Sequence, residues 1–425
     1  MARQVAIFRN IALADAHTGG QTSTVGETSL ANNGKHIFYS GNWYACRSSD
    51  NGGTWNIVNP FTFLPSADGG FCCDQTVHYD QGHDLTIWLL QYVETNGTNT
   101  LRIAVKRGAL DTPGGWQWWD LKPQQVNPAW AGEWFDYNHA ALSNNFLYVG
   151  TNSFRASDDR WTRSIIFRIP LDSLSSGANL AFDRFDSTTN FSLRCVQGAT
   201  DVMYFVSHNG NQARQLRVFA WPENSPTVTS RDINVRPWVP SPFSASVGNG
   251  PNWLARCDPR ITGAWVGNGL IGVMWTANRQ GTQRPFPFIR VARISAASMT
   301  LQDEPDIWSE KTAYAYPEAC ANTQGVAGVT MFMGGGDRQP THVVGFRDDL
   351  ENVWKLVPAA ISSDSPADSK WGDYLTCRRH SPDGLSWIAS GFTLQGGGTR
   401  TDIVPQYVHF GIQEQRPAAD RWLGV

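Results

Sequence analysis

Three carboxylic acids have the side chains that hydrolysis of a glycosidic bond requires. Asp74, Glu94 and Glu133 stand near the ends of apolar, strand-like segments. A glycosidase places two carboxyl groups on either side of the bond, about 5–5.5 Å apart for retention of configuration or about 6.5–9.5 Å apart for inversion. Asp74 with Glu94 or Glu133 is therefore one candidate pair.

A second set of residues suits β-elimination at a uronic acid. That reaction needs a cation that neutralises the substrate carboxylate and a base that removes the neighbouring proton. The candidate bases are Tyr137, His139 and His208. The candidate substrate-binding residues are Arg155, Arg194, Arg256, Arg279 and Tyr374.

The elements that would position these residues are short β-type segments bounded by Gly, Asn, Asp or Pro. One unit contains four of them, at residues 75–79, 85–92, 100–106 and 116–121. No segment has a sustained helical apolar period, so we expect almost no helix. The unit recurs with first strands that begin near Glu27, Asp74, Asp136, Arg194, Asp258, Glu318 and Asp373.

The spacing of these first strands, 47 to 64 residues, gives seven near-equal units. It predicts an all-β fold, a seven-bladed β-propeller of four-stranded antiparallel blades, with residues 1–425 as a single domain. Residues 5–11 are expected to supply the outer strand of the last blade and so close the ring. On a propeller, the loops before each innermost strand and after each second strand surround the channel mouth. The candidate residues stand at such positions.

Most of these residues also have an ordinary structural explanation. Asp74 shares its position with acids in other units, so it can simply cap turn amides. His139 can be a hydrogen-bonded channel histidine. Arg155 and Arg194 are harder to explain, because arginines that converge in a chain of net charge −3 need an anion or internal carboxylates. We therefore expect an anion-binding pocket.

Two local motifs are present. Ser48-Ser-Asp-Asn-Gly-Gly-Thr-Trp55 matches the Asp-box pattern S-x-D-x-G-x-T-W, in which Asp50 would accept hydrogen bonds from turn amides and Trp55 would pack between strands. Phe167-Arg168-Ile169-Pro170 is identical to the F-R-I-P motif of sialidases. It follows the Asp box, whereas in sialidases it precedes all of them, so we expect Arg168 to be an ordinary outer-strand arginine.

The Asp box and the repeats resemble those of sialidases and other carbohydrate-active propellers. The sequence also resembles ulvan lyases, rhamnose-glucuronate lyases and an α-L-rhamnosidase. The similar stretches are Trp88-Leu-Leu-Gln-Tyr, residues 146–152, Trp371-Gly-Asp-Tyr and residues 381–387.

The resemblance to the lyases implies particular site residues. In those enzymes blade two supplies two histidines, and blade three supplies a tyrosine and an arginine. The matching positions here are Asp74, Glu94, Tyr137 or His139, and Arg155. Only the blade-three half matches, and two carboxylates in place of the histidines favour hydrolysis.

Composition excludes several classes of protein. Lys+Arg 34 against Asp+Glu 37 leaves no basic surplus for nucleic acid. Aromatic residues make up 12 % and charged residues 17 %, which is too apolar for disorder. Apolar runs fall short of the roughly 20 residues of a membrane-spanning helix.

The seven cysteines fit no metal-ligand spacing, so we expect buried thiols, with one or two disulfides as the alternative.

Because the candidate arginines, tyrosines and histidines outnumber a clean carboxylate pair, we expect a carbohydrate-active enzyme that cleaves a uronate-containing oligo- or polysaccharide by β-elimination. Hydrolysis by a carboxylate pair is one alternative. A lectin that stacks sugars on some of the 19 Trp is another, although the differing strand starts favour one asymmetric site.

Other expectations concern cofactors, partners and location. No cofactor or catalytic metal is expected, apart from a structural calcium. The expected partner is an acidic oligo- or polysaccharide, not nucleic acid or a membrane, and the expected state is a monomer. We expect a secreted or periplasmic location, although the sequence shows no signal peptide.

Overall fold

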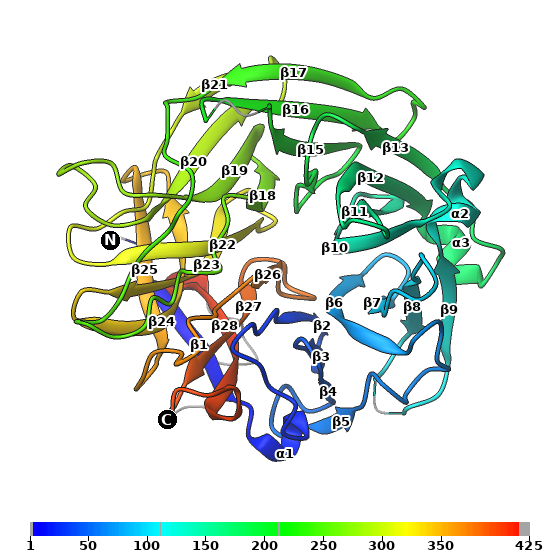
Figure 1. The fold of residues 1–425 in the computed structure, drawn as a ribbon, viewed down its shortest axis with the longest axis horizontal. Helices are drawn as coiled ribbons and strands as arrows, with labels where there is room; N and C mark the ends of the chain where they lie inside the picture. The colour runs from blue at the N-terminus through cyan, green and yellow to red at the C-terminus, as the bar shows by residue number, and fades with distance from the viewer. Residues whose placement is uncertain (1–2, 111, 211–212, 416–425) are drawn as a thin grey trace.

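The computed structural model describes residues 3–110, 112–210 and 213–415 of the chain. Seven four-stranded antiparallel sheets stand around a common axis (Figure 1). This arrangement confirms the seven-bladed β-propeller that the repeats predict. Within these ranges, three short helices lie in the connections, α1 (Asp15–Thr18), α2 (Pro123–Val126) and α3 (Leu171–Ser176). The same ranges contain three 3₁₀ turns, η1 (Pro128–Trp130), η2 (Arg400–Asp402) and η3 (Gln413–Gln415).

The first four blades follow one another along the chain, each built from its inner to its outer strand. Blade one contains β2 (Ser29–Asn33), β3 (His36–Ser40), β4 (Ala45–Ser48) and β5 (Asn56–Val58). Blade two contains β6 (Phe71–Asp80), β7 (Leu85–Tyr92), β8 (Leu101–Arg107) and β9 (Trp116–Leu121). Blade three contains β10 (Glu133–Leu142), β11 (Phe146–Arg155), β12 (Trp161–Pro170) and β13 (Asp183–Ser187). Blade four contains β14 (Arg194–Cys195), β15 (Val202–His208), β16 (Gln215–Pro222) and β17 (Thr229–Asn234).

The remaining blades complete the ring. Blade five contains β18 (Ile261–Gly267), β19 (Leu270–Ala277), β20 (Phe288–Ser295) and β21 (Thr300–Asp303). Blade six contains β22 (Ala313–Ala321), β23 (Ala327–Gly335), β24 (Arg338–Asp348) and β25 (Val353–Ile361). Blade seven contains β26 (Thr376–Arg379), β27 (Trp387–Leu394), β28 (Ile403–Ile412) and, as its outer strand, β1 (Val5–Ala12).

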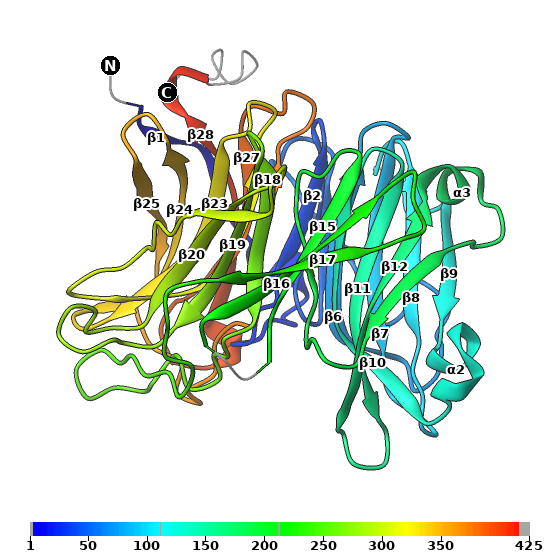
Figure 2. The same cartoon turned by 90° about the horizontal axis from the view of Figure 1, so that it is seen from above.

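Hydrogen bonds between the two ends of the chain close the ring. β1 pairs antiparallel with β28, from Val5 opposite Ile412 to Ala12 opposite Gln406. The expected closing strand is therefore confirmed. The start of β1 and the end of β28 lie together at one face of the disk (Figure 2). Since β26 runs in the same direction as β28, the inner strands begin at the opposite face.

Apolar side chains between neighbouring blades hold the sheets together. β7 is buried along its whole length, because the inner strands of a blade are covered on both sides. Trp88 of β7 is fully buried, and its ring centroid lies 5.0 Å from that of Phe38 in blade one. The outer strand β9 is largely exposed by comparison. This gradient explains why the inner strands read as continuous apolar runs in the sequence.

The Ser48–Trp55 turn joins β4 to β5 at the outer edge of blade one. The carboxylate of Asp50 accepts hydrogen bonds from the Thr54 amide and the Thr54 hydroxyl, both at 2.8 Å. These bonds lower the pKa of Asp50 to about 2. Gly52 has a φ of +85°, and its carbonyl accepts a 3.1 Å hydrogen bond from the indole of the buried Trp55. These contacts fix the turn, so its role is structural.

The cysteines are mostly buried thiols, as expected. Cys46, Cys195, Cys257, Cys320 and Cys377 are free and buried. Cys72 and Cys73 form a disulfide between adjacent residues of β6. Within the described part of the chain, no helix is long and apolar enough to cross a membrane.

Arg168 lies in β12 and has the structural role expected from its place in the sequence. Its side chain is 5 % exposed. The guanidinium donates to Asp183 and to the carbonyls of Pro222 (3.1 Å) and Ser225 (2.9 Å), and it lies 4.4 Å from the ring centroid of Trp221. Arg168 therefore ties blade three to blade four.

Truncation of this arginine is expected to destabilise the fold. Arg168→Ala leaves two partly buried carbonyls without a donor and removes a buried guanidinium from the Trp221 ring, so we expect the free energy of unfolding to fall by about 2–4 kcal/mol in urea denaturation. Arg155→Ala is the control, since the Arg155 side chain is 53 % exposed and pairs with Asp158 in its own turn. That variant should stay within about 0.5 kcal/mol of the wild type. Equal losses in both variants would contradict the assignment.

Candidate active site

Four acidic side chains meet at the face where the inner strands begin. Glu27 precedes β2, Asp74 lies in β6, Asp136 lies in β10 and Asp373 precedes β26. They come from blades one, two, three and seven, which are consecutive around the ring. The pKa values of Glu27, Asp74 and Asp136 are each raised in part by the charge of Asp373. We call these four residues the acidic cluster.

Glu27 and Asp74 form a carboxyl–carboxyl pair. Burial raises the pKa of both groups, and the pKa of Asp74 reaches about 6. The charge of Asp136 raises the pKa of Asp74 further, and a hydrogen bond joins the two side chains of the pair. Such a hydrogen bond requires that one of the carboxyl groups carry a proton. The contact raises the pKa of Glu27 and lowers that of Asp74, so Glu27 is the donor of the pair.

Asp136 is fixed by neighbouring donors. Its carboxylate accepts hydrogen bonds from the Gln91 amide (2.9 Å) and from the backbone N–H of Tyr137 (2.8 Å). Gln91 is buried, and its carbonyl accepts a 2.7 Å hydrogen bond from Asn138. Burial raises the pKa of Asp136 in spite of these donors. The arrangement holds the carboxylate in one orientation.

A bulge in β10 places Tyr137 beside the cluster. The register against β11 shifts between Asp136 and His139, and Tyr137 has a φ of +59°. A bulky residue rarely adopts this left-handed conformation, which costs on the order of 1–3 kcal/mol and is concentrated at functional sites. The bulge breaks the strict alternation of side chains along the strand.

Two arginines from the segment before β18 contact the cluster. Asp373 lies 3.3 Å from Nη2 of Arg256 and 3.6 Å from Nη2 of Arg260. Arg260 also donates to Asp258 at 2.7 Å, and its guanidinium lies 3.9 Å from the ring centroid of Tyr137. The side chain of Arg260 is 12 % exposed and that of Arg256 47 %, so Arg256 is the more accessible of the two.

A second set of charges fills the channel beyond the cluster. Arg194 forms an ion pair with the buried Glu318, and Arg378 lies 3.9 Å from the same carboxylate. His139 accepts a 3.3 Å hydrogen bond at Nε2 from the Cys195 amide. Burial and the charge of Arg194 hold the pKa of His139 well below its usual value. His139 is therefore neutral, and Arg194 is already compensated.

An aromatic cavity of about 810 Å³ opens next to the cluster, over blades three, four and five. It shares Tyr137 and Arg260 with the channel mouth. Its other aromatic walls are Trp161, Phe191 and Trp238. The ring centroid of Phe191 lies 5.7 Å from that of Trp161, and 40 % of Phe191 is exposed. We call this cavity the aromatic groove.

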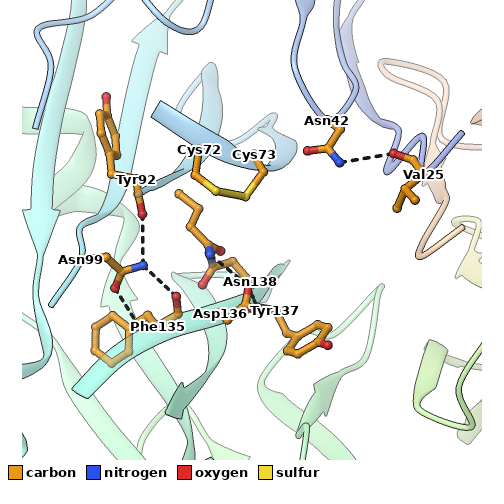
Figure 3. Close-up of a disulfide and its surroundings, with 11 residues drawn as sticks. Val25, Asn42, Cys72, Cys73, Tyr92, Asn99, Phe135, Asp136, Tyr137 and Asn138 are labelled. Carbon is orange, nitrogen blue, oxygen red and sulfur yellow. Dashed lines mark hydrogen bonds between the residues drawn. A yellow bond between two sulfur atoms is a disulfide. The ribbon is translucent and has the colours of Figure 1, made fainter. Parts of the chain in front are cut away.

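The Cys72–Cys73 disulfide borders the site immediately before Asp74. Figure 3 shows the disulfide above Asn138 and Asp136, with Asn42 beside it. Both cysteines are half-buried, and register shifts on either side of Cys73 interrupt the pairing of β6 with β7. The covalent bridge therefore restrains the backbone that carries Asp74.

Four residues predicted from the sequence line neither the channel mouth nor the aromatic groove. Glu94 is exposed and accepts a 2.6 Å hydrogen bond from the Gly97 amide in its own turn. Glu133 stands three residues before Asp136, about 10 Å along the strand, and pairs with Arg163 at 3.0 Å. Arg155 pairs with Asp158 beyond the end of β11, and Arg279 is exposed in the loop after β19.

The other predicted residues lie at or near the mouth. Asp74 belongs to the cluster. Arg256 contacts it through Asp373, and Tyr137 contacts it through Asp136. Tyr374 lines the channel, and its hydroxyl donates a 3.2 Å hydrogen bond to the Gln75 carbonyl. His208 lines the aromatic groove, and its Nε2 lies 2.8 Å from the Pro259 carbonyl. Burial lowers the pKa of His208 to about 4, so this histidine is neutral at pH 7.

The catalytic and binding residues predicted from the sequence omit Glu27, Asp136, Asp373 and Arg260, which the structure brings to the centre of the site, although the repeat pattern places the last three at the channel mouth. The first three mark strand starts in the repeat pattern. Their recurrence at equivalent places favours a turn-capping interpretation. The signal that distinguishes them is that equivalent positions of neighbouring blades converge on one axis.

The acidic cluster has the oxygen ligands that calcium prefers. Arg256 and Arg260, however, contact Asp373 and already supply positive charge to the cluster.

Comparisons by sequence find no relative, since no protein family and no curated protein matches the chain. Comparisons by structure find distant similarities. An α-L-arabinanase from Penicillium chrysogenum, in complex with arabinobiose, is 10 % identical, with coverage of 96 % of this chain and 99 % of that chain and a TM-score of 0.45. An α-L-arabinofuranosidase from Fusarium graminearum is 9 % identical, with coverages of 95 % and 97 % and a TM-score of 0.46.

A third similar structure is a sialidase from Trypanosoma rangeli, 8 % identical, with coverage of 97 % of this chain and 60 % of that chain and a TM-score of 0.44. Likeness at this level does not identify a function. The assignment of the fold rests on the strand pairing described above, and a function must be argued from the site itself.

Proposed function

We propose that the chain is a glycoside hydrolase and that the acidic cluster is its active site. The observation that carries the proposal is the proton-holding Glu27–Asp74 pair next to Asp136 and Asp373. Glycosidic hydrolysis needs one carboxyl group that is protonated near the working pH and another that is ionised. When the surroundings of neighbouring carboxyl groups give them different pKa values, one group stays protonated while the other is ionised.

Each residue of the acidic cluster has its own role in the reaction. Asp74 donates its proton to the glycosidic oxygen as the bond from that oxygen to the anomeric carbon breaks. Asp373, whose negative charge is stabilised by Arg256 and Arg260, faces the positive charge that develops on the sugar. A water molecule supplies the hydroxyl group of the new reducing end, and its proton leaves to a carboxylate of the cluster. Burial and the charge of Asp136 raise the pKa of Asp74, and the hydrogen bond from Glu27 lowers it in part.

The aromatic groove supports an oligosaccharide as the substrate. Aromatic rings offer large apolar faces at little cost in conformational entropy. Tyr137 belongs to both the groove and the channel mouth. A sugar bound at the cluster would therefore continue into the groove, where the exposed Phe191 can stack on a neighbouring unit.

The charge of the mouth favours a neutral sugar over a uronic acid. The mouth brings five carboxyl groups against the two guanidinium groups of Arg256 and Arg260. The five are Glu27, Asp74, Asp136, Asp258 and Asp373. A substrate carboxylate would add to this excess of negative charge. Arg194, an anion-binding candidate from the sequence, is paired with Glu318. The uronate substrate predicted from the sequence would depend on the half-exposed Arg256.

β-Elimination is the second candidate, and a specific contact favours it. Arg260 lies over the Tyr137 ring, and Arg256 is at the rim, so a cation and a phenol stand side by side. Burial raises the pKa of Tyr137, however, which makes its phenolate harder to form. Hydrolysis requires no such ionisation and uses the carboxyl groups that are present.

The proposal predicts a particular pH dependence. Asp74 must be protonated to act as the acid, and its pKa is raised to about 6. We therefore expect kcat/KM to fall as the pH rises through about 6, because the proton is lost from the free enzyme. The descending limb should disappear in Asp74→Asn, whose residual activity no longer depends on that proton. A limb that persists in the variant would assign the ionisation to another group.

A substrate panel tests the reaction class. The protein is incubated with neutral arabinans, xylans and galactans and with uronate-containing polysaccharides, while reducing ends and ultraviolet absorbance are recorded in parallel. New reducing ends without absorbance are expected. An increase in absorbance, from an unsaturated uronate, would favour elimination. Binding without either signal would leave a lectin.

A further inference from the structure

The Cys72–Cys73 disulfide lies in an irregular part of β6, directly before Asp74. Three residues of β6 pair with consecutive residues of β7, namely Phe71 with Tyr92, Cys73 with Gln91 and Gln75 with Leu90. Cys72 and Asp74 are therefore extra residues, each in a bulge that redirects its side chain. The direction of the Asp74 carboxyl group thus depends on the conformation of residues 72–74.

Both ends of this short stretch are anchored by side-chain contacts. Phe71 is buried, and its ring centroid lies 5.1 Å from that of Phe61. The Gln75 side chain donates hydrogen bonds to the carbonyls of Gly41 (2.7 Å) and Tyr44 (3.1 Å). These contacts do not involve the disulfide, so we expect β6 to keep its place when the disulfide is opened.

The disulfide is the covalent restraint on the residues between these anchors. It joins Cys72 to Cys73 and closes a ring through the peptide bond between them (Figure 3). This ring removes rotational freedom from the backbone next to Asp74. With the bond broken, residues 72–74 can adopt other backbone conformations between the same two anchors.

The same stretch reaches a second carboxylate of the acidic cluster. Cys73 lies opposite Gln91, whose side chain donates to Asp136 and accepts from Asn138. The charge of Asp136 in turn raises the pKa of Asp74. A shift of Cys73 would therefore change both the position of Asp74 and its electrostatic surroundings.

The chemistry of the seven cysteines directs an external reductant to this pair. Cys72 and Cys73 are half-buried, whereas the five free cysteines are buried. Burial raises the pKa of each free thiol, so these groups stay protonated near neutral pH. Thiolates, not thiols, carry out thiol–disulfide exchange. The free cysteines are therefore poor partners for exchange, and a dithiol from outside the chain must open the disulfide.

We propose that the Cys72–Cys73 disulfide is a switch that sets the position of the acid Asp74, so that cleavage depends on the redox state of this pair. The inference rests on the proposed function, because it concerns the same acid. A dithiol reductant attacks one sulfur as a thiolate, and the S–S bond breaks as a mixed disulfide forms. The second sulfur of the reductant then displaces the cysteine, and the reductant leaves as its own disulfide. The protein gains two electrons and the two protons of the reductant, which leaves Cys72 and Cys73 as thiols.

A titration of the aspartate carboxyl groups tests the switch without reference to activity. The full chain is labelled with carbon-13 aspartate and followed by NMR, oxidised and after reduction with dithiothreitol. The Asp74 signal is assigned by its loss in Asp74→Asn. We expect a midpoint of about 6 in the oxidised protein, and a midpoint at least about one pH unit lower after reduction, because release from burial removes the largest cause of the raised pKa. The same midpoint in both states would overturn the proposal.

Rates on the best substrate of the panel give the second readout. Reduction should lower kcat/KM by about 10–100-fold through kcat, because the acid is misplaced, and oxidised glutathione should restore the rate. The double variant Cys72→Ser/Cys73→Ser should have the low rate and show no response to dithiothreitol. Cys46→Ala removes a buried thiol of β4 and is the matched control, which should respond as the wild type does.

The outcomes separate the switch from the proposed function. Full activity in the double variant, or equal rates of the oxidised and reduced wild type, would overturn the switch. Reduced wild type serves as the test if the double variant fails to fold. A shifted Asp74 titration without hydrolysis in either state would support the movement of Asp74 but contradict the proposed function.

Discussion

Asp74→Asn is expected to lower kcat/KM on an unactivated oligosaccharide by about 10²–10⁴-fold. The amide cannot donate the proton that the carboxyl group, with its pKa of about 6, transfers to the leaving oxygen. The substitution keeps the size and shape of the side chain, so the loss reports chemistry and not packing. The measurement is the initial rate of reducing-end release at a pH below 6.

Two controls make this result specific to acid catalysis. A substrate with a nitrophenol leaving group needs little protonation, so Asp74→Asn should lose much less activity on it. Glu94→Gln changes an exposed carboxylate that only accepts a hydrogen bond in its own turn, and its activity should equal that of the wild type. Equal losses on both substrates, or a large loss in Glu94→Gln, would contradict the assignment of Asp74 as the acid.

Asp373→Asn is expected to have at least as large an effect, a loss of about 10³-fold or more in kcat/KM. The charge that opposes the developing positive charge on the sugar disappears, and the two guanidinium groups that contact Asp373 are left in excess. Both effects destabilise the transition state. The loss should appear in kcat on activated and unactivated substrates alike, because the step concerns the sugar and not the leaving group.

Arg256→Gln separates loss of the carboxylate from loss of its ion pair. It removes the 3.3 Å contact to Asp373 but leaves the carboxylate and Arg260 in place. We expect a loss of about 10-fold or less. Unfolding curves of both variants show whether the fold is intact. A loss in Arg256→Gln as large as that in Asp373→Asn would show that the carboxylate acts through the ion pair.

The ring of blades could be predicted because it follows from local signals that repeat. In blade two, the segments predicted at 85–92 and 116–121 coincide with β7 and β9. Residues 5–11 could be assigned to the last blade because a propeller leaves its first and last strands to pair with one another. Turn residues and apolar runs contain this information without any knowledge of long-range contacts.

The site could be predicted only in part, because it depends on register and on the path of loops. Glu94 and Glu133 have the right chemistry, but Glu94 lies in the turn after β7 and Glu133 three residues before Asp136 in β10. Turn and side-chain partners satisfy them there. The positive φ of Tyr137 arises from a bulge that the sequence does not indicate. Arg194 appears available in the sequence because Glu318, its partner, is 124 residues away.

The disulfide before Asp74 illustrates another limit. Adjacent cysteines seldom pair, and their spacing excludes a metal site without indicating a bond. The extended, interrupted strand at Cys73 permits the pairing seen here. Its consequence is local, since the bridge restrains the residues that lead into the proposed acid.

Digestion in water enriched in oxygen-18 tests the central claim most directly. The protein acts on the best substrate from the panel, and the products are weighed by mass spectrometry. Hydrolysis by the acidic cluster predicts that each new reducing end carries one oxygen from the solvent, and that Asp74→Asn forms this product far more slowly. Products without solvent oxygen that carry a new double bond would contradict the account and show that the bond is broken by elimination.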